Sequence, residues 1–119
     1  MKYVIDTSVL IEGRISEMIE KGELKGTIII PEAVLAELEA QANFGKMSGF
    51  RGLEEIKILR EIAEKKGIRV EFKGERPTVE QIRLAKSGEI DNLIRMLAEK
   101  ENAVLITSDR VQYTVAVAK

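Results

Sequence analysis

The chain has 119 residues, of which 45% are hydrophobic and 33% charged, and its formal net charge is −1. This length suits a single domain that buries about two-thirds of its unfolded surface. Neither cysteine nor histidine occurs, which excludes disulfides, zinc sites with thiolate or imidazole ligands, Ser-His-Asp triads and Cys-His nucleophiles. Any metal would therefore need oxygen ligands, which favours Mg²⁺ or Mn²⁺.

No stretch has the pattern of a membrane span or a signal peptide. Pro31 and Glu32 interrupt the longest apolar run well short of about 20 residues, and Asp6 and Glu12 interrupt the apolar N-terminus. Together with the absence of cysteine, this predicts a cytoplasmic protein. A net charge of −1 gives no overall attraction for nucleic acid, so phosphate binding would need a local basic patch.

Apolar runs alternate with helical patterns along the chain. The runs predict strands at 2–5, 27–30, 68–72 and 103–106. The patterns between them predict helices at 14–21, 32–42, 53–66, 79–86 and 89–101. Thr78 and Gln81 form a capping-box pattern at the fourth helix. Because most of the strand runs lack alternation, we expect parallel strands that are covered on both faces. The order predicts an α/β fold, a three-layer α/β/α sandwich with a mostly parallel central sheet.

The last nine residues, 111–119, have a helical pattern, and no strand follows them. A parallel α/β fold would normally continue with another strand. We therefore expect that the last strand is missing and that residues 1–119 form a single domain, the N-terminal fragment of a longer protein.

Residues 43–52, N-F-G-K-M-S-G-F-R-G, predict a loop. Three glycines favour irregular backbone, and two basic and two aromatic residues accompany them. Two interpretations remain open. The segment is either a flexible connection between helices or a mobile segment that faces a substrate.

Four acids are candidates for one shared site. Asp6 and Asp109 follow the first and last predicted strands, and ligands of open α/β sheets bind beyond the carboxyl ends of strands. Glu37 and Asp91 border the buried faces of their predicted helices. The alternatives are simple: Asp6 and Asp109 are N-caps of the following helices, and Glu37 and Asp91 are solvated helix charges.

Four motifs carry a family resemblance: V-I-D-T-S at 4–8, V-L-A-E-L at 34–38, G-E-I-D-N-L-I at 88–94 and I-T-S-D at 106–109. In this order they resemble the PIN-domain nucleases, over essentially the whole chain. The resemblance implies a PIN-like domain whose metal site holds Mg²⁺ or Mn²⁺, with Asp6, Glu37, Asp91 and Asp109 as catalytic and metal-binding acids. Ser8 and Thr107 look like the supporting hydroxyls of the family.

The function implied by this resemblance is a metal-dependent endoribonuclease. It would cleave phosphodiester bonds of single-stranded RNA by metal-activated water. Four basic residues flank the expected site in sequence and are candidate RNA contacts: Arg14, Lys46, Arg51 and Arg110. One departure from the family is Val111, which replaces an acid often found two residues after the last aspartate, so that three or four acids remain.

Two longer stretches, D-T-S-V-L-I-E-G-R-I and S-G-F-R-G-L-E-E-I, narrow the resemblance. They look like the N-terminal PIN module of microbial proteins that continue into a P-loop ATPase and a KH domain. This resemblance implies that both further domains follow Lys119. It also implies a homo-oligomer, for which Ile19, Met47 and Met96 are candidate apolar contacts.

Three other functions compete with this interpretation. The chain could be a catalytically weak or inactive PIN module that serves assembly or nucleic-acid positioning next to the ATPase. It could also be a toxin-type PIN ribonuclease that an antitoxin inhibits. A phosphatase with Asp6 as its nucleophile would want a second acid two residues later, where Ser8 stands.

Overall fold

A computed structural model describes residues 1–85 and 88–108. Four strands and six helices follow one another in these residues, in the order β1 (Lys2–Ile5), α1 (Thr7–Ile11), α2 (Arg14–Glu20), β2 (Thr27–Pro31), α3 (Glu32–Asn43), α4 (Met47–Lys66), β3 (Arg69–Lys73), α5 (Val79–Leu84), α6 (Glu89–Lys100) and β4 (Val104–Ile106). The predicted helix at 111–119 lies outside the described residues.

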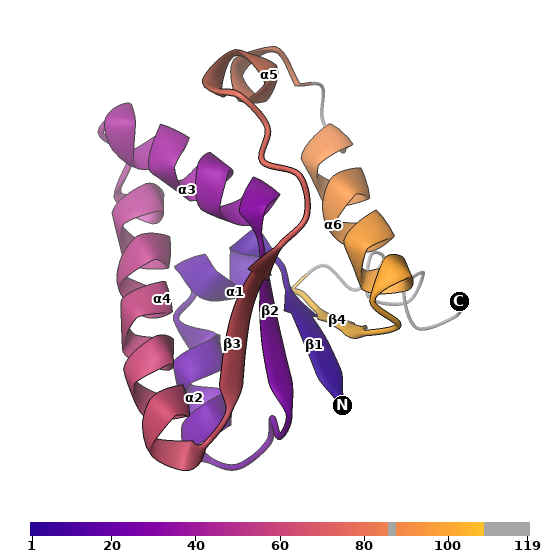
Figure 1. Cartoon of the computed structure of the whole chain (residues 1–119). Helices are drawn as coiled ribbons and strands as arrows, with labels where there is room; N and C mark the ends of the chain where they lie inside the picture. The colour runs from indigo at the N-terminus through magenta and orange to yellow at the C-terminus, as the bar shows by residue number, and fades with distance from the viewer. Residues whose placement is uncertain (86–87, 109–119) are drawn as a thin grey trace.

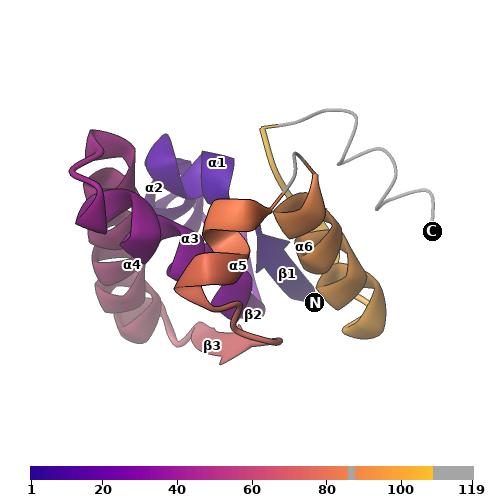
Figure 2. The same ribbon diagram turned by 90° about the horizontal axis from the view of Figure 1, so that it is seen from above.

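The four strands form one parallel sheet in the order β3-β2-β1-β4. Figure 2 shows α1, α2 and α4 on one side of β1, β2 and β3, and α6 on the other side. In Figure 1 the strands point toward α3 and α5, which lie beyond their carboxyl ends. This arrangement confirms the predicted α/β fold with a parallel central sheet.

Coverage on both faces explains why the central strands read as unbroken apolar runs. Val4 and Ile5 of β1 and Ile28, Ile29 and Ile30 of β2 are fully buried. Successive side chains of a strand point to opposite faces, so both faces of the sheet must be covered by helices. The edge strand β3 is covered less completely, and its side chains are exposed or partly buried. This strand therefore contains charged residues.

The short helix α1 is an element that the sequence pattern does not reveal. It has five residues, which is too short for an apolar periodicity to appear. Its N-cap is Asp6, whose side chain accepts a hydrogen bond from the N–H of Thr7. Asp6 therefore does cap the helix that follows it, as the alternative interpretation expects. The cap uses one carboxylate oxygen, and the other oxygen remains for other partners.

The predicted loop at 43–52 is wrong over most of its length, because α4 begins at Met47 rather than at 53. Its glycines bring α3 and α4 close together. A Cβ atom on Gly49 would lie 2.3 Å from the backbone N of Ala42, and one on Gly52 would lie 2.3 Å from Cδ2 of Leu38. Helical glycines at such positions permit close packing of two backbones, and the interpretation as a flexible segment does not hold.

Other boundaries agree with the predictions more closely. The capping box is confirmed: Thr78 accepts from the N–H of Gln81, whose side chain accepts from the N–H of Thr78. The helix that it starts ends at Leu84 instead of 86, where Ala85 turns to an extended conformation.

Among the predicted apolar contacts, Ile19 is fully buried and cannot serve as a surface contact, whereas Met47 and Met96 are exposed. Ile19 lies in α2, where it belongs to the hydrophobic core. No helix in the described residues is both long and apolar enough to cross a membrane.

Candidate functional site

Asp6 lies at the carboxyl edge of the sheet, where β1 ends and α1 begins. Its side chain is only 4% exposed, and Oδ1 accepts the hydrogen bond from the N–H of Thr7 at 2.8 Å. The N–H of Asp6 donates to the carbonyl of Ile106 at 3.0 Å. The ends of β1 and β4 therefore lie side by side, and the chain that leads to Asp109 leaves the sheet next to Asp6.

Two hydroxyls converge on the second oxygen of this carboxylate. Oγ of Ser8 donates to Oδ2 of Asp6 at 3.1 Å, and Oγ1 of Thr107 donates to the same atom at 2.6 Å. These are the two hydroxyls that the family resemblance implies as supporting groups. Because they come from α1 and from the segment after β4, they hold the Asp6 carboxylate in one orientation from two sides.

Glu37 and Asp91 lie in two other helices, α3 and α6. Burial raises the pKa of the Glu37 carboxyl, the nearby Thr7 side chain lowers it, and the negative charges of Asp6 and Asp91 raise it. An acid whose pKa responds to two other acids lies in the same electrostatic environment as both. Glu37 is thus near enough to Asp6 and to Asp91 to respond to both charges, although Asp91 itself is exposed. The fourth predicted acid, Asp109, lies outside the described residues, and the shared site remains a prediction.

Among the described residues, no lysine or arginine forms an ion pair with Asp6 or Glu37. The buried Asp6 carboxylate instead accepts three hydrogen bonds, from the N–H of Thr7 and from the hydroxyls of Ser8 and Thr107, which help to stabilise its charge. A cation near Asp6 and Glu37 would lower the repulsion between these two acids.

The other buried acid, Glu55, shows what an acid with a purely structural role looks like in this protein. It is 4% exposed, and its two oxygens accept hydrogen bonds from the N–H and the hydroxyl of Ser16 at 2.7 and 2.9 Å. These bonds cap the start of α2, where Gly13 has no side chain to do so. Both oxygens of Glu55 thus have their partners in one residue, whereas the partners of Asp6 come from Thr7, Ser8 and Thr107.

The residues around Asp6 fit a hard divalent cation in chemistry and in charge. Carboxylate and hydroxyl oxygens are suitable ligands for Mg²⁺ or Mn²⁺. The buried hydroxyl of Thr7 makes no hydrogen bond of normal geometry to any described residue, but it lies near enough to Glu37 to lower the pKa of that acid. However, no three acids among residues 1–85 and 88–108 lie close enough to hold a metal by themselves.

The predicted RNA contacts lie on several elements. Arg14, at the start of α2, is exposed, and its Nη1 lies 3.9 Å from Oε1 of Glu12. Arg51 of α4 lines a groove together with Glu12 and Phe50. Lys46 is exposed just before α4. Arg110 lies outside the described residues, and the roles of all four remain predictions.

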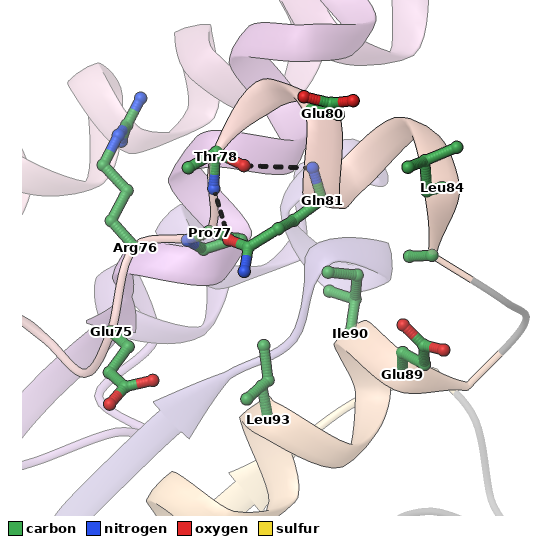
Figure 3. A pocket seen from close by; sticks show the side chains of 11 residues that line it. Glu75, Arg76, Pro77, Thr78, Glu80, Gln81, Leu84, Glu89, Ile90 and Leu93 are labelled. Atoms are coloured by element: carbon green, nitrogen blue, oxygen red, sulfur yellow. Dashed lines mark hydrogen bonds between the residues drawn. The ribbon is translucent and has the colours of Figure 1, made fainter.

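A separate pocket opens between α5 and α6 (Figure 3). The side chains of Ile90 and Leu93 face the capping box that starts α5. Its lining includes Glu75, Glu80 and Glu89 and one basic residue, Arg76. The guanidinium of Arg76 forms ion pairs with Glu32 and Glu39 of α3. An excess of acids makes this pocket unsuited to phosphate, and Asp6, Glu37 and Asp91 do not belong to its lining.

Glu37→Gln is expected to stabilise the metal-free chain at neutral pH. Because the pKa of Glu37 is raised in the folded state, its charged form costs stability above that pKa, and this cost disappears as the pH falls below the ordinary value of about 4.3. Urea unfolding in EDTA at several pH values between 4 and 8 should show the advantage of the variant shrinking in acid. An equal difference at every pH would contradict the electrostatic cause.

The exposed Glu61, in α4, provides a matched control for this measurement. Glu61→Gln removes the same charge from a solvated position, so it should change the free energy of unfolding by less than about 0.5 kcal/mol.

Comparison with known proteins relates the chain to one family. A family model described as PIN domain matches residues 3–118. The chain is 56% identical over 119 residues to an uncharacterized KH and PIN-domain containing protein of Methanocaldococcus jannaschii, an alignment that covers 99% of this chain and 18% of that protein. It is 32% identical over 117 residues to an uncharacterized PIN and TRAM-domain containing protein of Thermus thermophilus, covering 95% of this chain and 31% of that protein.

A solved structure has the same fold. It is described as a domain of a functionally unknown protein from Methanocaldococcus jannaschii, and it matches with a TM-score of 0.93 at 56% identity. The match covers 98% of this chain and 84% of that chain. Since the chain spans only 18% and 31% of the two curated relatives, the comparisons concern one domain of longer proteins.

Proposed function

Because the chain belongs to the PIN-domain family, we propose that it is a metal-dependent endoribonuclease module that cleaves phosphodiester bonds of single-stranded RNA. The observation that carries this proposal is the buried carboxylate of Asp6, which lies near enough to Glu37 for the two charges to interact, while neither acid forms an ion pair with a lysine or arginine among the described residues. Such a group of acids at the carboxyl edge of a parallel sheet is suited to binding a cation.

Each acid has a proposed part in holding Mg²⁺ or Mn²⁺. Asp6 and Asp109 would bind the ion directly, and Glu37 and Asp91 directly or through water. Ser8 and Thr107 orient the Asp6 carboxylate through their hydrogen bonds, as outer groups of metal sites commonly do. When bound, the ion supplies an activated water and neutralises charge on the phosphate and the leaving oxygen.

Electrostatic repulsion explains why this cluster would retain a cation. Two carboxylates about 4 Å apart repel by roughly 4 kcal/mol at an effective dielectric constant of 20. Any two of these acids that come this close would destabilise the fold by such an amount, and a divalent ion between them would remove the repulsion. The chain has no histidine to act as a general base, so the proposed chemistry depends on the carboxylates and on the ion that they hold.

RNA binding is proposed to involve the exposed basic residues Arg14, Lys46 and Arg51, together with Arg110. We also propose that the longer protein adds a KH domain, as the relative from Methanocaldococcus jannaschii does by its description. An ATPase domain and assembly into a homo-oligomer remain further proposals from the family resemblance. A KH domain binds single-stranded RNA by contacting the backbone of the RNA. Such a domain would bring a single-stranded substrate to the nuclease module.

Two observations favour the alternative of a catalytically weak module. The acids in the described residues do not complete a metal site on their own, and Val111 replaces an acid that the family often has. If Asp109 does not supply the missing ligand, metal affinity would be low. The domain would then serve to position RNA or to assemble the longer protein.

Incubation of labelled single-stranded RNA with the purified chain tests the two functions against each other. With Mn²⁺ or Mg²⁺, the nuclease proposal expects internal cleavage that leaves 5′-phosphate and 3′-hydroxyl ends, and EDTA should abolish it. RNA that is bound but stays intact at millimolar Mn²⁺ would favour the positioning module.

A further inference from the structure

A hydrogen-bond network fastens the segment after β4 to the helix α1. The N–H of Ser108 donates to Oγ of Ser8 at 3.2 Å, and the hydroxyl of Ser108 donates to Oε1 of Glu12. Neither Ser108 nor Glu12 belongs to the set of acids and hydroxyls assigned to the site above. Their contact joins two sequence motifs that lie 96 residues apart.

The two ends of α1 hold this segment at two points. Asp6 is the N-cap of the helix and accepts from Thr107, whereas Glu12 is the C-cap and accepts from Ser108. Between these ends the helix is anchored in the core by Val9 and Leu10, which are 3% and 0% exposed. A rigid helix therefore sets the spacing between the two contacts.

The segment needs such contacts because the sheet supports it poorly. β4 has only three residues and pairs with β1 alone among the described strands. Past Ile106 the regular ladder ends, and Ser108 is exposed to solvent. The hydrogen bonds to Asp6, Ser8 and Glu12 therefore help to keep Thr107 and Ser108 in place.

We propose that Glu12 is a positioning residue of the metal site. By holding Ser108, it keeps the Thr107 hydroxyl on Oδ2 of Asp6 and sets the point from which the chain continues to Asp109. This inference rests on the proposed function, because the site that it positions is the proposed site for Mg²⁺ or Mn²⁺. Glu12 itself acts through Ser108 and does not need to touch the ion.

Variants of the full chain separate this role from a simple effect of charge. Glu12→Ala removes both the acceptor and the charge, Glu12→Gln keeps an acceptor oxygen without the charge, and Ser108→Ala removes the donor while leaving every charge in place. Glu17→Ala is the matched control, because Glu17 is an exposed acid of α2 that pairs with Lys21. All variants are first compared by thermal unfolding to show that they fold.

Two measurements report the role: the affinity for Mn²⁺ by electron paramagnetic resonance, and hydrogen–deuterium exchange of the amides of residues 106–108. Glu12→Ala and Ser108→Ala should each weaken Mn²⁺ binding by roughly tenfold, as loss of an outer group does in metal sites, and should speed exchange of the Ser108 amide. The double variant should lose no more than either single variant, because both remove one contact. Glu12→Gln and Glu17→Ala should bind Mn²⁺ like the wild type.

The possible failures are distinguishable. A wild type that neither binds Mn²⁺ nor cleaves RNA would overturn the proposed function, and the positioning role with it. Wild-type binding that Glu12→Ala and Ser108→Ala leave unchanged would overturn the positioning role alone. Equal losses in Glu12→Gln and Glu12→Ala would mean that Glu12 acts through its charge, which also overturns positioning through the hydrogen bond.

Discussion

Asp6→Asn is expected to reduce RNA cleavage at least about 100-fold while the fold is retained. Loss of an outer group of a metal site costs about 10- to 100-fold, so loss of a direct ligand should cost at least the upper value. The fold should survive because asparagine is as good an N-cap as aspartate, and its side-chain oxygen can still accept from the N–H of Thr7. Cleavage rates with Mn²⁺ and thermal unfolding of both proteins check the two parts of this prediction.

The effect of this substitution on stability should depend on the metal. In EDTA, removal of the Asp6 charge relieves its repulsion with Glu37, which offsets part of the cost of losing the two hydroxyl hydrogen bonds to Oδ2, so the variant should differ little from the wild type. In millimolar Mn²⁺ the wild type should gain stability by binding, and the variant should gain little. Glu61→Gln serves as the control for loss of a negative charge at an exposed site.

Cleavage that Asp6→Asn leaves unchanged would identify a contaminating nuclease or a site elsewhere. A variant that is inactive because it is unfolded would show no cooperative thermal transition, so the two reasons for lost activity can be told apart. A wild type that Mn²⁺ does not stabilise would remove the basis for Asp6 as a ligand.

Much of the fold could be predicted because burial on two faces leaves a simple signature. Residues 2–5 and 27–30 are each hydrophobic at all positions but the first, and the structure has strands at Lys2–Ile5 and Thr27–Pro31. The helix α1 could not be predicted in this way. It is held by its cap at Asp6 and by the burial of Val9 and Leu10, neither of which produces a periodic pattern within five residues.

The location of the candidate site could be predicted in part, from the ends of the predicted strands. The rule that parallel strands carry ligands beyond their carboxyl ends places Asp6, and the family motifs suggest Glu37 and Asp91. The contact between Glu12 and Ser108 follows only from the tertiary structure, because nothing in the local sequence of either residue specifies its partner. The Thr-Ser pairs beside Asp6 and Asp109 are a signal in the sequence, but the family resemblance implies a role only for Ser8 and Thr107.

The glycines of the segment 43–52 led to a wrong prediction. They form a pattern that is typical of loops, but in the structure Gly49 and Gly52 allow two helices to pack closely. Glycine is favoured in flexible or strained backbone and also wherever a side chain would collide with a neighbour. The sequence alone does not distinguish these causes. At Gly49 and Gly52 the neighbour is α3, which lies too close to α4 for a Cβ atom.

Gly49→Ala is therefore expected to destabilise the chain by about 3 kcal/mol, the upper end of the usual cost of overpacking. The new Cβ atom would lie 2.3 Å from the backbone N of Ala42 and 2.6 Å from the carbonyl oxygen of Leu38. Backbone atoms cannot rotate away, so α3 and α4 would have to separate. The favourable helix propensity of alanine, about 0.5–1 kcal/mol over glycine, offsets only part of this cost. Urea unfolding gives the difference directly.

Gly52→Ala, on the same helix, tests whether the loss of stability depends on what the new Cβ atom meets, a backbone or a side chain. Its Cβ atom would meet Cδ2 of Leu38 at 2.3 Å, and a side-chain end can move where a backbone cannot. Because Leu38 is fully buried, we expect a smaller but real loss of about 1–2 kcal/mol. Lys57→Ala, at an exposed position of α4, should stay within about 0.5 kcal/mol of the wild type. A Gly49→Ala variant as stable as Lys57→Ala would show that these glycines are not required for packing, and a larger loss at Gly52 than at Gly49 would show that backbone contact is not the cause.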